Sequence, residues 1–519
     1  MIRVGLQQLS TDDFHKILFL DEKIELVPEA VERVDANYRF LKEFAKGKVI
    51  YGINTGLGPM AQYKINGNSE LQLQYNLIRS HCSGCGTPLP AMYARATMLA
   101  RLNTFMQARS GIHVEVVELL SELINRNINP FIPEHGGVGA SGDLVQLAHL
   151  ALNLIGEGEM WYHGSLQPAE KVFQEEKLTP VTMHIREGLS LINGTSAMTG
   201  IGLINIIHAR NLLDWSILAS SMINEIVESY DDHFSEGLNK VKMHYGQNQV
   251  ARLMRTILQG SGLIRHRADH LYNGTTGDVE IFSHKVQEYY SIRCVPQVLG
   301  PILDTILNAA LVLTNEVNSS NDNPIIDSEG GNVFHGGNFH GDYVALEMDK
   351  LKIAITKLSM LSERQLNYLM NDKLNQKLPP FINLGKLGFN LGMQGMQFTA
   401  VSTVAENQTL SFPMSIHSIT NNNDNQDIVS MGANAAMMTK RVIDHTYIVC
   451  SIQMIAILQA IDFLKIRPSL SPFSCKTFDA LRAIVPKFTE DTTKYREIRL
   501  IADYMMKSRP EFELTGKTC

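Results

Sequence analysis

Four long segments with helical apolar periodicity constrain the fold of this chain more than any other feature. They cover residues 196–230, 296–318, 342–371 and 431–465. Each is longer than the roughly 8 to 20 residues usual for a helix of a globular protein. Their apolar faces are also broader than the narrow stripe of a two-stranded coiled coil. The four segments therefore predict a central helical bundle buried on several sides, with faces that can also pack against copies of the same chain.

The rest of the 519 residues has the same helical character. Shorter periodic segments predict helices over residues 92–109, 114–126 and 143–156. We therefore expect an all-α fold with an N-terminal region (1–195), a long-helix bundle (196–465) and a helical C-terminal tail (466–519). Glycine- and asparagine-rich breaks separate these helices, and such breaks are the places where chemistry can be sited.

Composition and charge exclude several classes of protein. The net charge is −7 and the basic residues form no long runs, which argues against a nucleic-acid surface. The N-terminal residues show no apolar core of signal-peptide length. We find no uninterrupted apolar run of about 18 residues, so we expect neither a membrane span nor a membrane partner. These features predict a cytoplasmic protein.

Six scattered cysteines do not form a disulfide framework in a chain of this length. Cys82 and Cys85 form a C-x-x-C pair, but it follows a helix-like segment rather than the strand of a thioredoxin-like unit. No second pair is spaced to complete a zinc site. We therefore interpret both as buried or partly exposed thiols, with redox chemistry a minor alternative, and expect no metal.

The glycine-rich stretch EHGGVGASGDL, residues 134–144, admits several interpretations. Gly137 to Gly142 match the dinucleotide-binding pattern G-x-G-x-x-G, which requires a buried strand before it. Two prolines in residues 127–135 argue against such a strand, because proline lacks the N–H that a sheet needs. A nucleophile elbow would need G-x-S-x-G, and Ser141 is followed at once by Gly142. Taken alone, the stretch indicates a helix start capped by Ser141 or Asp143.

Eight further motifs accompany this stretch, and the nine occur in a fixed order. They read YGINTGLG from Tyr51, YNLIRSHCSG, EHGGVGASGDL, LINGT, YYSIRC, DNP, GNFHG, VAEN and DNQDIVSMG. Through these motifs, from about Val49 to Gly432, the chain resembles the family of histidine, phenylalanine and tyrosine ammonia-lyases and aminomutases, and it looks closest to bacterial tyrosine ammonia-lyases. The resemblance implies a fumarase/aspartase-like helical architecture. It also implies a homotetramer whose active sites are shared between subunits.

In that family an internal Ala-Ser-Gly cyclises into 4-methylidene-imidazol-5-one (MIO), with no external cofactor. The resemblance places this group at Ala140-Ser141-Gly142. Physical chemistry is compatible with it. Glycine permits the tight approach of its amide nitrogen to the alanine carbonyl, and loss of the serine hydroxyl leaves the methylidene carbon. A helix starting at about Asp143 would increase the electrophilicity of the ring.

The resemblance also assigns roles to other residues, one by one. Tyr51 matches the base that removes the β-proton, and Asn193 matches the asparagine that hydrogen-bonds the ring oxygen. Arg293 matches the arginine that binds the substrate carboxylate as a bidentate fork. The remaining matches near the amine, the carboxylate, the ring or the pocket wall are Tyr290, Gln287, Phe339, Asn323, Glu406 and Gln426.

Ser80-His81 occupies the position that selects the substrate in this family. A histidine there can hydrogen-bond a phenol or an imidazole, and it finds no such partner on phenylalanine. Together with DNQDIVSMG, which looks closer to the tyrosine and phenylalanine enzymes, it favours conversion of L-tyrosine to p-coumarate and ammonia. Histidine to urocanate, and a tyrosine 2,3-aminomutase reaction, remain open. Leu57 departs from the common Phe of the first motif, which leaves the packing of that loop uncertain.

Two interpretations from other classes compete with this one. A Rossmann oxidoreductase would bind a nicotinamide cofactor tightly, and a catalytically inactive helical scaffold would keep an unmodified chain. The mass of the peptide carrying residues 140–142 separates the three.

Overall fold

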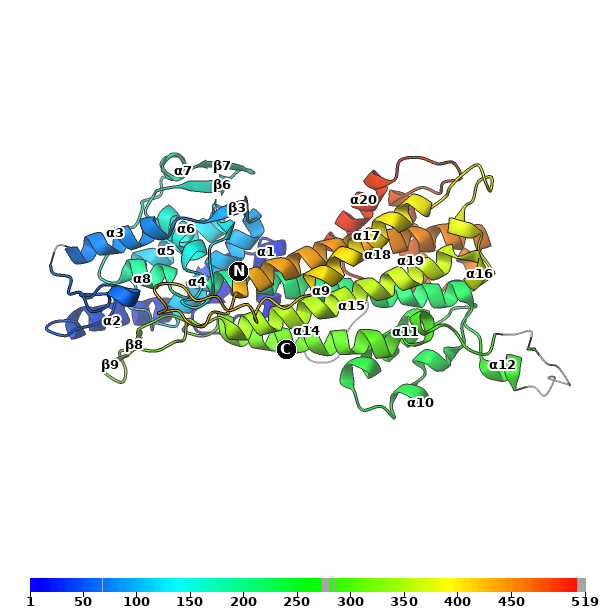
Figure 1. The fold of residues 1–519 in the computed structure, drawn as a ribbon, viewed down its shortest axis with the longest axis horizontal. Helices are drawn as coiled ribbons and strands as arrows, with labels where there is room; N and C mark the ends of the chain where they lie inside the picture. Colours follow the sequence, from blue (N-terminus) through cyan, green and yellow to red (C-terminus); the bar gives the residue numbers. More distant parts are fainter. Residues whose placement is uncertain (68, 273–280, 283–284, 511–519) are drawn as a thin grey trace.

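Long helices connect the two ends of an elongated molecule (Figure 1). The computed structural model describes residues 1–510 except 68, 273–280 and 283–284. The N-terminal region gathers at one end, and the C-terminal helices pack toward the other. The expectation of a mainly helical fold is confirmed.

Four helices form the central bundle, and each lies within a few residues of its predicted span. They are α9 (Ser196–Val227), α14 (Val295–Val317), α15 (Asp342–Met370) and α18 (Gly432–Leu464). Helix α15 packs against α14 and α18, and α9 packs against both α14 and α18. Because neighbours surround α9 and α18, their side chains are buried almost all round.

The N-terminal region combines helices with very short strands. Its helices are α1 (Thr11–Phe19), α2 (Pro28–Phe44), α3 (Ser69–His81), α4 (Ala91–Met106), α5 (Val114–Arg126), α6 (Leu144–Leu154), α7 (Ala169–Glu176) and α8 (Glu187–Ile192). Its strands are β1 (Ile2–Val4), β2 (Ile24–Leu26), β3 (Cys85–Pro88), β4 (Asn129–Pro130), β5 (Pro133–His135), β6 (Glu159–Tyr162) and β7 (Ser165–Pro168). β1 and β2 pair in parallel, whereas β3–β5 and β4–β6–β7 are antiparallel. The parallel unit β1–α1–β2 ends far before the glycine stretch, and β5, the strand that precedes Gly137, is antiparallel to β3, so the stretch is not part of a dinucleotide-binding unit.

The remaining elements flank the bundle. They are α10 (Glu236–Asn239), α11 (Tyr245–Leu258), α12 (Arg267–Leu271), α13 (Tyr290–Arg293), the hairpin β8 (Ile325–Asp327) and β9 (Asn332–Phe334), α16 (Asp372–Asn375), α17 (Gln394–Leu410), α19 (Pro472–Ile484) and α20 (Tyr495–Lys507). Helix α17 lies along α15 and α18, and α20 packs on α18 and α9.

Two described helices, α14 and α18, are long and apolar enough to cross a membrane by length and composition alone. The most apolar window of α18 is 78% buried inside the protein, as in the core helix of a bundle. The corresponding window of α14 is only 39% buried. This is weak evidence for a span, so the absence of a membrane partner stays a prediction.

Candidate active site

The Ala140-Ser141-Gly142 loop lies where several long helices begin. The carbonyl of Val138 accepts a hydrogen bond from Met431 N, at the start of α18, at 2.9 Å. The carbonyl of Gly139 accepts one from Gly341 N, at the start of α15, at 3.0 Å. On the other side, Asp143 N donates to Gly194 O at 2.7 Å, two residues before α9. The loop therefore lies among the N-terminal ends of α6, α9, α15 and α18. Their partial positive charge would make a group formed from this loop more electrophilic.

Gly142 has a backbone that other residues adopt only with strain. Its φ is +71°, in the left-handed region. An added Cβ would lie 2.0 Å from the carbonyl oxygen of Gly194, so no larger residue fits. This compressed backbone is compatible with the tight cyclisation that MIO formation requires.

Both oxygens of Ser141 are hydrogen-bonded by side-chain amides. Asn193 Nδ2 donates to the Ser141 carbonyl oxygen at 3.0 Å, and Gln426 Nε2 donates to Ser141 Oγ at 2.8 Å. The carbonyl oxygen is the one that an MIO ring would retain, and Oγ is the one that dehydration would remove. Asn193 Oδ1 is buried without a partner among the described residues. The residues present thus fit the group that the resemblance implies.

Two buried charged groups fix the backbone around this loop. Asp143 precedes α6, but its side chain caps α9 instead: Oδ2 accepts from Ala197 N at 2.9 Å and Met198 N at 3.0 Å. Burial raises the pKa of Asp143 to about 7, although these hydrogen bonds and Arg101 favour the charged form. Arg101, on α4, donates to the carbonyl of Asn193 at 2.8 Å and also to that of Ser190. Burial lowers the pKa of Arg101 to about 10, which leaves it cationic at neutral pH.

A pocket of about 530 Å³ opens beside this loop. Six of the residues assigned from the sequence line it, from five separate parts of the chain. They are Tyr51, Ser80, His81, Ser141, Asn193 and Gln426. Apolar side chains such as Leu73, Leu144 and Leu189 form much of the remaining wall. The pocket has the size and mixed lining of a small-molecule site.

Two loops form the mouth of the pocket. The hydroxyl oxygen of Tyr51 accepts a hydrogen bond from Gly58 N at 2.9 Å, which holds the phenol within its own loop. Across from it, Asn422, Asn423 and Asp424 all have positive φ. Asparagine and aspartate tolerate this left-handed conformation better than other residues except glycine. The polar run around Gln426 therefore forms a tight turn that also faces the pocket.

The ring of His81 is held by its own helix. Nδ1 lies 2.9 Å from the carbonyl oxygen of Leu77 and 3.1 Å from Ser80 Oγ. A carbonyl can only accept, so Nδ1 carries the proton in the neutral ring, and Nε2 is left as an acceptor. Such an acceptor suits a ligand with an O–H or N–H donor.

A second group of assigned residues lies elsewhere in the chain. Gln287 and Tyr290 line a different pocket, which also includes Tyr368. Arg293 donates to Gln287 and lies over the ring of Tyr290, 4.8 Å from its centroid. Helix α15 begins beside Gly139 and carries Tyr368 near its other end. At about 1.5 Å per residue, Asp342 and Tyr368 lie about 39 Å apart. One chain therefore does not bring Arg293 and Tyr290 to Ser141.

Three further assigned residues line neither pocket. Asn323 accepts from Gly336 N at 2.8 Å, which supports the loop that carries Phe339. Phe339 is half-buried two residues before Gly341, whose N–H binds the carbonyl of Gly139. Glu406 is exposed on α17, with an oxygen 4.0 Å from Nε2 of His445.

The structure also shows residues that the sequence analysis missed. Tyr63, Asn76, Asn422 and Asn425 line the main pocket, and Arg101 supports it from beneath. Asn422 and Asn425 lie in a polar run and Asn76 lies on α3, but nothing in the sequence showed that these side chains face the pocket, and nothing marked Arg101 among the apolar residues of its helix. Outside the site, His113, Glu115 and His184 are close enough to hold a metal ion, so the expected absence of a metal stays a prediction.

Comparison with known proteins places this geometry in a family. A model of aromatic amino acid lyases matches residues 9–483. The chain belongs to the aromatic amino acid lyase family. It is thus an enzyme, related to ammonia-lyases and aminomutases that act on carbon–nitrogen bonds.

Individual members of the aromatic amino acid lyase family resemble the chain over nearly its full length. A tyrosine 2,3-aminomutase from Myxococcus fulvus is 40% identical over 90% of each chain. A histidine ammonia-lyase from Geobacillus sp. (strain WCH70) is 37% identical over 96% of this chain and 95% of the other. The MIO-dependent tyrosine 2,3-aminomutase of Streptomyces globisporus is 36% identical over 98% of this chain and 95% of its own. The crystal structure of tyrosine aminomutase from that organism superposes with a TM-score of 0.94, at 34% identity, over 98% of this chain and 97% of that one.

Proposed function

We propose that this enzyme eliminates ammonia from L-tyrosine to give p-coumarate, using an MIO group formed autocatalytically from Ala140, Ser141 and Gly142. The observation that carries this proposal is the pair of hydrogen bonds to Ser141, on the retained oxygen from Asn193 and on the departing one from Gln426. A compressed glycine and converging helix ends surround the same residue. One relative is named as MIO-dependent, which agrees with this.

Different residues of the chain have different roles in the proposed reaction. The MIO group, once formed, would supply an electrophile that bonds the substrate amine and makes it a better leaving group. Asn193 holds the ring oxygen and stabilises negative charge that develops on it. Tyr51 removes the β-proton, and the released electron pair forms the double bond as the amine departs. The leucine-rich walls exclude water from the reacting carbons.

The substrate carboxylate needs a cation, and no lysine or arginine is among the described residues that line the pocket. Arg293 matches the family arginine for that task but lies toward the far end of α15. We therefore propose a homotetramer in which Arg293 and Tyr290 of one subunit complete the pocket of another. Phe339, Glu406, Asn323 and Gln287 would act from such shared surfaces. The partly exposed apolar face of α14 supports assembly. The enzyme would act in the cytoplasm.

Tyrosine is favoured because His81 presents an acceptor. With Nδ1 donating to Leu77 O, Nε2 is available for the phenol O–H. Phenylalanine has no donor at that point, and burying an unmatched nitrogen costs about 1–3 kcal/mol. Histidine also carries an N–H donor, so it is the competing substrate.

A second candidate reaction, tyrosine 2,3-aminomutase, is favoured by the relatives named above. It shares the elimination and differs in returning ammonia to the β-carbon before release. The lyase and aminomutase reactions are distinguished by their products. Purified enzyme would receive L-tyrosine, L-histidine and L-phenylalanine separately. We would measure p-coumarate, urocanate and cinnamate by ultraviolet absorbance and β-tyrosine by chromatography.

We expect p-coumarate as the main product and the highest kcat/KM with tyrosine. If β-tyrosine were the main product, the enzyme would be an aminomutase rather than a lyase. Preferential formation of urocanate would overturn the choice of tyrosine.

A further inference from the structure

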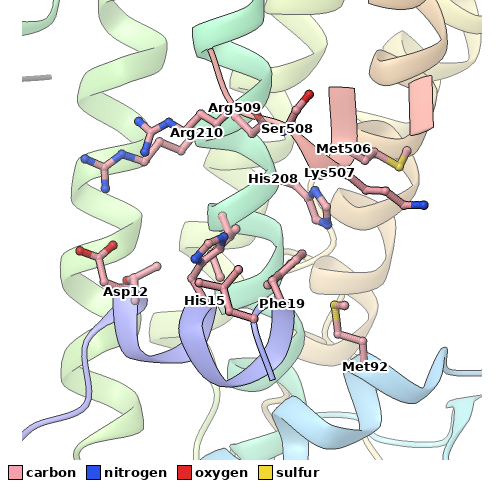
Figure 2. Close-up of a pocket in the computed structure, with 14 residues that line it drawn as sticks. Asp12, His15, Phe19, Met92, His208, Arg210, Met506, Lys507, Ser508 and Arg509 are labelled. Atoms are coloured by element: carbon pink, nitrogen blue, oxygen red, sulfur yellow. The ribbon is translucent and has the colours of Figure 1, made fainter. Parts of the chain in front are cut away.

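A second cavity lies away from the catalytic pocket, where α1 and the end of α20 meet α9. Its volume is about 560 Å³, and it is lined by residues of α1, α9 and the segment that ends α20 (Figure 2). It shares no lining residue with the pocket that contains Ser141. Its size is within the range of small-molecule sites.

Cationic groups meet at one side of this cavity. Arg210 has no hydrogen-bond or ion-pair partner among the described residues, and its Nε is buried and unsatisfied. Arg509 uses its Nε to bind buried Asp214, so its terminal nitrogens remain for another acceptor. Figure 2 shows the two arginine side chains beside each other, pointing the same way above Asp12. Lys507 adds a third cation to the lining.

Two adjacent guanidinium groups repel each other unless an anion lies between them. Asp214 is charged at neutral pH, although burial raises its pKa to about 6; it bonds Arg509 and also attracts Arg210, so one negative charge faces two guanidinium groups. Asp12 is exposed on the first turn of α1 and forms no hydrogen bond or ion pair with either arginine among the described residues. The site therefore retains unbalanced positive charge, with bidentate donors suited to a carboxylate.

The opposite wall is apolar and aromatic. His15 stacks on Phe19 at 5.2 Å between centroids, and Phe19 meets His208 edge-on at 5.4 Å. Burial lowers the pKa of His15 and brings that of His208 to about 4, so both rings are neutral near pH 7. Met92 and Met506 extend the apolar surface. Such a wall suits a flat ring, which an inorganic anion does not possess.

We propose that this cavity is a non-catalytic binding site for an aromatic monocarboxylate, with the carboxylate held by Arg210 and Arg509 and the ring against Phe19 and the methionines. The site joins α1 and residues 506–509 to α9, whose first turn is capped by Asp143 beside the catalytic loop. The inference does not depend on which amino acid the enzyme converts.

Trp215 provides a local reporter for a test. Its Nε1 donates to the carbonyl oxygens of Met505 and Ser508, and Ser508 lines the cavity. The chain has two tryptophans, so Trp161→Phe leaves Trp215 as the single emitter. We would titrate this full-length variant with 3-phenylpropanoate, which does not absorb where tryptophan is excited. We expect a saturable change in Trp215 emission.

Matched controls locate the response. Arg210→Gln should weaken binding about tenfold or more, as loss of a charge-assisted bidentate contact predicts, while Asp12→Asn should tighten it. Arg293→Ala, in the catalytic machinery, should leave the emission response unchanged. Activity of Arg210→Gln toward saturating tyrosine should be retained, which shows that it folds.

Three results would overturn the proposal. They are the absence of a saturable response, an equal response to uncharged 3-phenylpropanol, and an unchanged affinity in Arg210→Gln. A response to inorganic phosphate of equal strength would overturn the aromatic class of ligand.

Discussion

At the scale of single residues, the candidate site depends on a few close contacts. The sequence could indicate Ser141 and Asn193 because they belong to short motifs with fixed spacing. It could not indicate Arg101, which reaches the Asn193 carbonyl from a helix far away in sequence. Nor could it show that Nδ1 of His81 is held by Leu77, because that depends on a rotamer.

Gly142→Ala tests the backbone requirement. An alanine at φ +71° is strained by about 1–2 kcal/mol, and its Cβ would collide with Gly194 O. We expect a lower Tm by calorimetry and little or no MIO by mass spectrometry. Gly139→Ala is a less suitable control, because its Cβ would also collide, with Ser430. Exposed Gly164→Ala, which has open space at positive φ, separates strain from collision.

His81→Phe tests the choice of substrate. The variant loses the Nε2 acceptor and offers an apolar wall, so kcat/KM for tyrosine should fall and that for phenylalanine should rise. One lost hydrogen bond of about 1–1.5 kcal/mol corresponds to roughly tenfold. An unchanged ratio of the two kcat/KM values would refute the role of His81.

At the scale of elements, the long helices were predictable and the small strands were not. The predicted spans 342–371 and 431–465 differ from α15 and α18 by about one residue at each end. Long periodic segments carry many repeated signals. Strand β3, at Cys85–Pro88, pairs with β5 over too few residues to show alternation, and both contain proline. The sequence also could not predict that the N-terminal ends of several helices meet at one loop, because this arises from tertiary packing.

The raised pKa of Asp143, whose carboxylate caps α9, predicts that the stability of the protein depends on pH. Burial raises its folded pKa to about 7, above its ordinary value of 3.8, so the folded state keeps the proton longer. The free energy of unfolding should therefore fall as pH rises from about 4 to about 7. Each pKa unit corresponds to about 1.4 kcal/mol. In Asp143→Asn, Tm should fall less steeply over this window. Slopes equal to those of the parent enzyme would contradict the assignment.

At the scale of the whole molecule, one chain keeps apart two groups that the proposed reaction needs together. Ser141 and Arg293 lie toward opposite ends of α15. The sequence order of motifs contains no information about which subunit supplies each one. In the described chain Arg293 is not part of the pocket that contains Ser141, which is why we propose that a neighbouring subunit supplies the arginine.

Mixing two inactive variants tests this sharing. Ser141→Ala lacks the group, and Arg293→Ala lacks the carboxylate ligand, so each homo-oligomer should have little activity. Mixed oligomers, made by co-expression with two different tags, contain some pockets with both residues intact. We expect these to regain a substantial fraction of p-coumarate formation. Recovery no greater than that of the separate variants would show that each chain forms its site alone.

The mass of the proteolytic peptide that carries residues 140–142 tests the central claim most directly. The account predicts that this peptide from active enzyme is lighter than its sequence mass by two water molecules, and that Ser141→Ala abolishes both this loss and the activity. A peptide of unmodified mass from fully active, folded enzyme would contradict the account.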